Sequence, residues 1–179
     1  MPQAVTHILV PLLIASLFRD YYFKKNKRKF PLEYVLIIGI AGIIPDLDVL
    51  AFWVLSFFGF SFNEVHRTFM HTLFVPLIFM IFALIFSIIK VEDIGRHKLK
   101  LNIIFVLLAV GSVAHLVLDW IFVGYIRPVY PFSDFSIGLN LFGYLPLQLQ
   151  MIAPPSLDAG LFIIYLVYLE VKHKISDFI

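Results

Sequence analysis

The stretch HRTFMHTLFVPLIFMIFALIFSII, residues 66–89, decides the fold class. From Leu73 to Ile89 it is a continuous apolar run without a charged residue, close to the length that a bilayer-spanning helix requires. The rest of the chain has the same character, because 61% of its 179 residues are hydrophobic and only 15% are charged. A soluble domain has about 45–50% apolar and about 25% charged residues. The sequence therefore predicts an all-α integral membrane protein.

Five apolar segments predict a bundle of about five transmembrane helices in a single domain, residues 1–179. The segments are residues 4–18, 32–57, 69–89, 101–126 and 159–171. We expect the first to be retained, because its basic residues follow the apolar run and those of a signal peptide precede it. The last segment is short for a bilayer, and residues 135–152 before it are expected to form an outer-side loop or a re-entrant segment.

The distribution of Lys and Arg predicts the orientation in the membrane. Basic residues gather in the first connection (Arg19, Lys24, Lys25, Lys27, Arg28, Lys29), the third (Lys90, Arg96, Lys98, Lys100) and the C-terminal tail (Lys172, Lys174). The second connection has only Arg67 and the fourth only Arg127. Since cytoplasmic loops carry the excess of positive charge, we expect the N-terminus outside and the C-terminus in the cytoplasm, in the inner or plasma membrane of the cell.

Histidine and aspartate residues occur at one depth of the predicted bundle. Those inside or beside apolar segments are His7, Asp46, Asp48, His66, His71, His115 and Asp119. A charged side chain at the centre of a membrane helix costs about 2.5–3.5 kcal/mol on insertion scales, so such residues are expected to face one another or a wet cavity. Counted from the cytoplasmic end at about 1.5 Å per residue, five of them lie about 18–28 Å up four different helices. They therefore converge in the outer half of the bilayer.

The spacing of these residues favours a metal site. His115 and Asp119 are four residues apart and share one helix face. Pro45 breaks its helix, so that Asp46 and Asp48 can turn toward one centre. The chain has no cysteine and a net charge of only +2, so any metal is held by His, Asp or Glu and nothing indicates nucleic-acid binding. Seven ligands suffice for one or two zinc ions sharing a carboxylate, with manganese or another divalent metal as the alternative.

These motifs resemble, in order, the YdjM-like family of inner-membrane proteins, whose members are described as LexA-binding and as membrane-bound metal-dependent hydrolases. The resemblance covers residues 4–140 and rests on T-H at Thr6, P-D-L-D at Pro45–Asp48, H-R-x3-H-T at His66–Thr72, A-H-x3-D at Ala114–Asp119 and Y-P-F at Tyr130–Phe132. The family usually has Gly and Ser where this chain has Thr68 and Thr72. More distantly, the family resembles the zinc phospholipase C and P1 nuclease group, which implies a phosphoester substrate.

A hydrolytic mechanism follows as a hypothesis. The seven His and Asp residues would hold metal, which lowers the pKa of a bound water. Arg67 would hold a phosphate oxygen with its planar fork, and Asp48 or Asp134 would accept the proton. Because the site is expected in the outer half of the bilayer, the favoured substrate is a membrane phospholipid or another lipid-linked phosphoester.

Other interpretations of the same residues remain open. His7 alone could be a packing residue, Asp46 and Asp48 a helix cap or proton relay, and Arg67 a side chain that extends to the interface. Asp134 could simply form a turn. At the level of function, a scaffold protein with a structural metal is the first alternative. An ion-coupled transporter is the second, and it would need polar residues through the cytoplasmic half as well.

Overall fold

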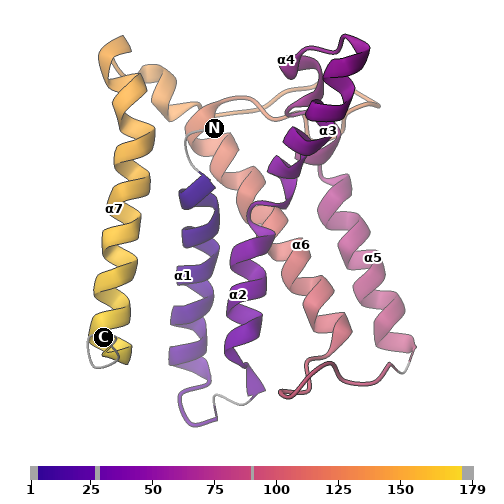
Figure 1. Ribbon diagram of the computed structural model, residues 1–179, viewed down its shortest axis with the longest axis vertical. Coiled ribbons are helices and arrows are strands. Elements are labelled where there is room, and N and C mark those ends of the chain that lie inside the picture. Colours follow the sequence, from indigo (N-terminus) through magenta and orange to yellow (C-terminus); the bar gives the residue numbers. More distant parts are fainter. Residues whose placement is uncertain (1–3, 27–28, 90, 175–179) are drawn as a thin grey trace.

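The protein is a bundle of helices standing side by side (Figure 1). The structure, a computed structural model, describes residues 4–26, 29–89 and 91–174. Lys27, Arg28 and Lys90, three of the loop cations used above, lie outside the described residues. Within the described ranges the only β-structure consists of two isolated bridges, Ile94 with Leu99 and Ile126 with Ile137. The predicted all-α membrane fold is confirmed.

The five predicted apolar segments all form helices. The bundle consists of α1 (Ala4–Tyr22), α2 (Leu32–Ala41), α5 (Phe74–Ile88), α6 (Leu101–Leu118) and α7 (Leu147–His173), while α3 (Asp48–Leu55) and α4 (Phe62–Val65) lie at one end. α1, α7 and the helical stretch Leu101–Val123 are long and apolar enough to cross a membrane. The pair Leu32–Ala41 and Ile44–Phe58, bent by 53°, supplies a fourth candidate span, and α5 is a shorter apolar helix.

The bend between α2 and α3 lies where Pro45 was expected to break the helix. Pro45 has no backbone N–H to donate, so the α-helical pattern gives way to a short 3-10 turn, Ile44–Leu47. Gly42 at the end of α2 permits close contact with α1, because a Cβ there would lie 1.9 Å from the carbonyl oxygen of His7. The break therefore sits directly against the N-terminal part of α1.

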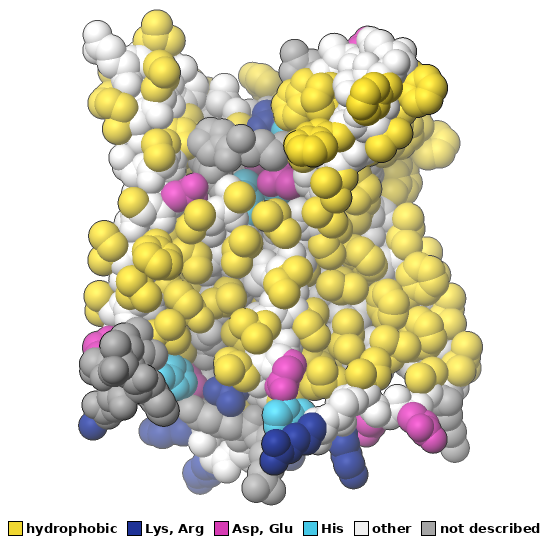
Figure 2. Space-filling view, in the orientation of Figure 1, with side chains coloured by type: hydrophobic (Ala, Val, Ile, Leu, Met, Phe, Trp, Pro, Cys, Tyr) yellow, Lys and Arg dark blue, Asp and Glu magenta, His cyan; other side chains and the backbone are white. Residues whose placement is uncertain are grey.

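The buried core lies between α1, α2 and α6. It includes Leu12, Val35, Ile38 and Leu107, and α6 approaches α2 closely because a Cβ at Gly111 would lie 2.4 Å from the Cβ of Ala41. Apolar side chains also cover the outside of the bundle as a broad band, with Lys and Arg gathered at its lower end in Figure 2. An apolar outer surface between polar ends is what a bilayer requires.

The last helix differs from its predicted bounds. α7 begins at Leu147, not residue 159, and continues through Pro154 and Pro155. A membrane helix tolerates proline where neighbouring groups satisfy the freed carbonyls. The preceding segment 124–146 is an irregular connection that crosses one end of the bundle (Figure 1), so residues 147–152 belong to α7 instead.

Candidate metal centre

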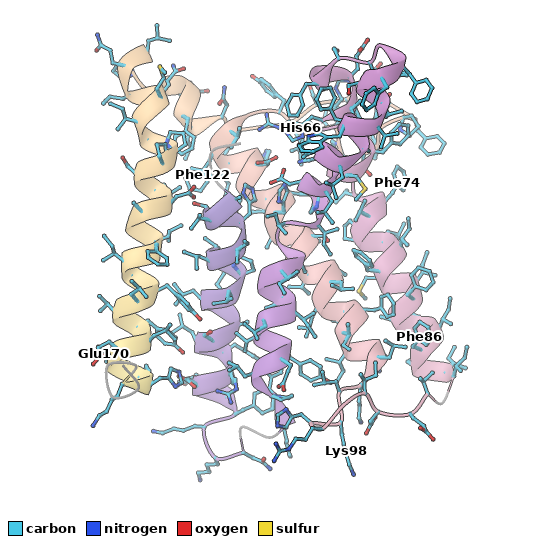
Figure 3. All side chains as sticks on the ribbon, viewed as in Figure 1. His66, Phe74, Phe86, Lys98, Phe122 and Glu170 are labelled. Atoms are coloured by element: carbon cyan, nitrogen blue, oxygen red, sulfur yellow. The ribbon has the colours of Figure 1, made fainter. Side chains whose placement is uncertain are left out.

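All seven predicted metal ligands come together at one end of the bundle. His7 comes from α1 and His115 from α6. Asp46 and Asp48 flank the bend, and Asp119 begins a π-helical turn, Asp119–Val123, after α6. His66 and His71 lie between α4 and α5; His66 is labelled in Figure 3, at the end of the bundle opposite Lys98. Segments far apart in sequence thus deliver the residues to one buried place.

The middle of this cluster holds two histidine nitrogens and two carboxylate oxygens, and each oxygen lies at nearly equal distances from the two nitrogens. The Nε2 atoms of His71 and His115 are 3.2 Å apart. Asp46 Oδ1 lies 3.5 Å from the first and 3.7 Å from the second, and Asp119 Oδ2 lies 3.6 and 3.7 Å from them. Tetrahedral zinc with bonds of about 2.0–2.1 Å places its ligands about 3.3–3.4 Å apart. The observed spacings are close to that range, and Asp46, His71 and His115 form a group that could hold a metal ion.

The outer ring nitrogens show which way the two central histidines face. His115 Nδ1 lies 2.7 Å from the carbonyl oxygen of Gly42, so it carries a proton and donates it. His71 Nδ1 lies 3.2 Å from Asp48 Oδ2 without forming an aligned hydrogen bond, and the negative charge there favours a protonated nitrogen. Both Nε2 atoms then present lone pairs to the centre, beside two carboxylates. Lone pairs and negative charge facing one another are stabilised by a proton or a metal cation between them, and this arrangement is typical of histidines that bind metal.

Asp48 occupies a second position, one step away from the centre. Its carboxylate lies 3.0 and 3.1 Å from His66 Nδ1, accepts the backbone N–H of Arg67 at 3.1 Å, and faces His71 Nδ1. Asp48, His66 and His71 also form a group that could hold an ion. However, the His71 nitrogen in that group is Nδ1, whereas Nε2 faces the centre, so Asp48 is better placed to orient His71 than to share its metal.

His7 borders the centre on the other side. Its Nε2 lies 3.3 Å from Asp119 Oδ1, and its ring packs at 4.0 Å between centroids on the ring of His115. His7, His115 and Asp119 form a further group that could hold a metal ion. One Asp119 oxygen thus faces His7 and the other faces His71 and His115, so this carboxylate contacts histidines on both sides.

Arg67 lies at the rim of the cluster. Its side chain is about one-third exposed, and its Nε lies 3.8 Å from Asp119 Oδ2. The Nε atom is buried and has no hydrogen-bond partner among the described residues. The backbone of Arg67 adopts a left-handed φ of 61°, which turns its N–H toward Asp48. The guanidinium therefore has an unused donor beside the carboxylates of the centre.

The short helix α4 leads directly into His66. Ser61 donates from its backbone N–H and its hydroxyl to Glu64, both at 2.7 Å, forming a capping box at the start of α4. These hydrogen bonds lower the pKa of the Glu64 carboxyl. The helix ends directly before His66, whose ring stacks on Phe62 at 4.7 Å between centroids. The first turn of α4 thus fixes the position of His66.

The structure changes the interpretation of two acidic residues. Asp134, expected as a base or a turn residue, is not brought to the centre: its side chain is 87% exposed and lies 3.9 Å from Arg127. Its connection runs over the end of the bundle, outside the buried cluster. Conversely, Asp158 of α7 accepts hydrogen bonds from the backbone and hydroxyl of Thr6, at 2.8 and 2.5 Å, next to His7. Sequence analysis missed it because it lay before the expected start of the last helix.

The fold and cluster together define a class: a multi-helix membrane protein with buried His and Asp groups that could bind a metal ion. The chain belongs to the YdjM inner membrane protein family, which it matches over residues 1–174. No curated protein and no solved structure matches the chain. The predicted family and the membrane location are confirmed.

Proposed function

We propose that the protein is a metal-dependent hydrolase, with zinc as the favoured ion. One observation carries the proposal: the two Nε2 atoms of His71 and His115 face each other at 3.2 Å, flanked by Asp46 and Asp119, while their Nδ1 atoms face Gly42 and Asp48. A bound divalent metal would supply Lewis-acid activation of water at this place. The remaining steps are assigned to side chains of the chain itself.

His71, His115, Asp46 and Asp119 would hold the ion. Asp48 and the Gly42 carbonyl keep the two histidines in the tautomer with Nε2 unprotonated. If a second ion binds, it would lie toward His7, on the other oxygen of Asp119. Manganese and other divalent ions that prefer nitrogen and oxygen ligands fit the same set, since none of its members is a thiolate.

We assign the role of proton acceptor to His66. Asp48 was the first candidate for this role, but its oxygens already face His66, His71 and the N–H of Arg67. The Asp48 carboxylate beside His66 Nδ1 favours a proton on that nitrogen, which leaves His66 Nε2 with a lone pair. His66 and Asp48 thus form a base and its orienting carboxylate, an arrangement used in general base catalysis.

Arg67 favours a phosphoester over other substrates. Its buried Nε lacks a hydrogen-bond partner among the described residues and lies near Asp119, where a phosphate oxygen would complete its bonding. The cluster lies toward the end of the bundle, next to the apolar band of Figure 2. A phospholipid or another lipid-linked phosphoester in the membrane would carry its phosphate at the same height as this cluster and could reach it sideways from the bilayer.

The transporter alternative needs a polar path along the bundle. α1 does carry a second polar group, Asp20, near its other end, where Tyr168 donates to it at 2.9 Å. Between His7 and that end, the buried residues of α1 include Leu9, Leu12 and Ala15. An apolar layer therefore separates the two polar regions, which argues for chemistry at one end.

The test combines metal content with turnover in one set of variants. Purified protein should retain about one or two equivalents of zinc or a similar ion by elemental analysis. It should release phosphate or head group from phospholipids or lipid-linked phosphates in vesicles, and lose this activity with a chelator and regain it with zinc.

Arg67→Lys keeps the charge but loses the planar fork, so turnover should fall at least tenfold with unchanged metal content. His71→Ala is the matched control, which should lose metal and turnover together. Metal-loaded protein that hydrolyses none of these substrates would favour the scaffold with a structural metal.

A further inference from the structure

A polar cavity lies at the end of the bundle opposite the metal centre. It has a volume of about 800 Å³ and lies between the connection that leads into α2 and the turn that leads into α6. Lys29, Arg96, Lys98 and Lys100 line it, against a single carboxylate, Asp93. Lys98 is labelled at this end in Figure 3. Three positive charges are therefore in excess around one cavity.

In the described part of the chain, these four cations outnumber the carboxylates around them. Within residues 4–26, 29–89 and 91–174, none of the four forms an ion pair with a carboxylate. His97, which also lines the cavity, is paired with Glu33 and does not add to the excess. Positive charges held around one cavity repel one another, so binding of an anion between them is electrostatically favourable.

The backbone holds the cavity in shape. Ile94 and Leu99 exchange hydrogen bonds of 2.8 and 2.9 Å, which closes a turn that carries Arg96 and Lys98. The backbone N–H of Lys100 donates to the hydroxyl of buried Tyr34 at 2.7 Å and so anchors the turn to α2. The cationic turn is therefore positioned by the fold.

The starts of two helices add to the positive potential. α2 follows Pro31 and α6 follows Lys100, and both residues line the cavity. The N-terminal ends of α-helices carry partial positive charge and unpaired N–H groups. Together with the four cations, they make the cavity suited to a phosphate group.

The surroundings show what kind of phosphate fits. Pro31, Tyr34 and Ile103 give the cavity an apolar part. Figure 2 shows the apolar band of the bundle ending where the Lys and Arg side chains begin. We propose that this cavity binds the phosphate-bearing head group of an anionic phospholipid, whose acyl chains lie along the apolar band. Basic pockets between membrane helices bind anionic head groups in this way. The proposal does not depend on hydrolysis at the metal centre.

The test measures lipid selectivity of the purified full-length protein in detergent. Native mass spectrometry, titrated with phosphatidylglycerol or phosphatidylcholine, gives dissociation constants for the first bound lipid. We expect phosphatidylglycerol to bind about tenfold more tightly than phosphatidylcholine. Arg96→Gln with Lys98→Gln should reduce this ratio to about twofold or less. Lys24→Gln with Lys25→Gln, which removes two cations of the same end outside the cavity, should leave it near tenfold.

Each alternative gives a different result. Equal affinity of the wild-type protein for the two lipids overturns the proposal, and so does an equal loss of selectivity in both double variants, which would indicate diffuse surface charge. Inorganic phosphate and glycerol 3-phosphate form the third arm. If either binds at micromolar concentration and abolishes phosphatidylglycerol selectivity, the cavity is a site for a soluble phosphate and the lipid assignment is wrong. Lys29→Gln, on the other connection, should lower selectivity as well, which checks the result with an independent variant.

Discussion

Replacing Asp48 by Asn separates an orienting carboxylate from a metal ligand. The substitution keeps the shape of the side chain but removes the charge that faces His71 Nδ1 at 3.2 Å, so His71 can turn or change tautomer. Removing a carboxylate that orients a metal-binding histidine costs about 1.4–2.8 kcal/mol of metal-binding free energy. With about 1.4 kcal/mol per factor of ten, we expect Asp48→Asn to weaken zinc binding about 10- to 100-fold. Loss of orienting partners has effects of this size in other metal sites.

Removing a residue that binds zinc directly should weaken zinc binding more than Asp48→Asn does. Structural zinc binds with about 10–16 kcal/mol, so one of four ligands accounts for about 2.5–4 kcal/mol, or roughly 100- to 1000-fold. Asp46→Asn and Asp119→Asn are the matched substitutions with this expectation, since their oxygens face both central Nε2 atoms. Asp134→Asn, at an exposed carboxylate, is the control and should leave affinity unchanged.

The assay is a competition titration of zinc against a chromophoric chelator, on purified variants whose helix content is first checked by circular dichroism. The ranking decides the outcome. If Asp48→Asn loses as much affinity as Asp119→Asn, Asp48 is a ligand and the assignment by ring nitrogens is refuted. If it loses nothing, the contact with His71 does not orient the centre.

Three further predictions concern other parts of the chain. His66→Gln should lower turnover at least a hundredfold with metal content near normal, because the proton acceptor is lost; equal loss of metal would make His66 a ligand. Gly42→Ala should destabilise the protein by about 1–3 kcal/mol or more in thermal unfolding, since its Cβ would lie 1.9 Å from the His7 carbonyl oxygen; an unchanged melting temperature would contradict this close contact. A cysteine at Ser133 should react with an impermeant thiol reagent from outside intact cells and one at Asn26 should not, and the reverse labelling would invert the orientation.

Much of the architecture and of the candidate site could be predicted from the sequence. Apolar runs have a direct physical cause, so the five helices were found, and the cost of burying ionisable groups pointed to the seven His and Asp residues that the structure brings together. The roles within the cluster were less accessible. Nothing in H-R-x3-H shows that one ring nitrogen of His71 faces Asp48 and the other the centre, because that depends on the packing of four separate segments.

The misplaced residues have physical causes as well. The predicted apolar segment begins only at residue 159, whereas α7 begins at Leu147, so Asp158 falls just outside the predicted helix. Asp134 follows a family-like Y-P-F motif, but proximity in sequence to a motif does not bring a side chain into a buried site. The cationic cavity was visible only as a count of Lys and Arg, since its shape comes from two connections that are far apart in sequence.

The break at Pro45 has a consequence for how this centre could evolve. In an unbroken helix the carbonyl of Gly42 would accept the N–H of residue 46, four positions on. Here the N–H of Asp46 bonds to Ile43 instead, and the Gly42 oxygen is left to accept the proton of His115. The break in one helix thus frees a backbone hydrogen-bond acceptor for a side chain on another helix. Mutations that restore continuous helical hydrogen bonding at Pro45 would make α2 more regular and the metal centre less well ordered. Selection for a stable helix and selection for this centre therefore act in opposite directions at the break.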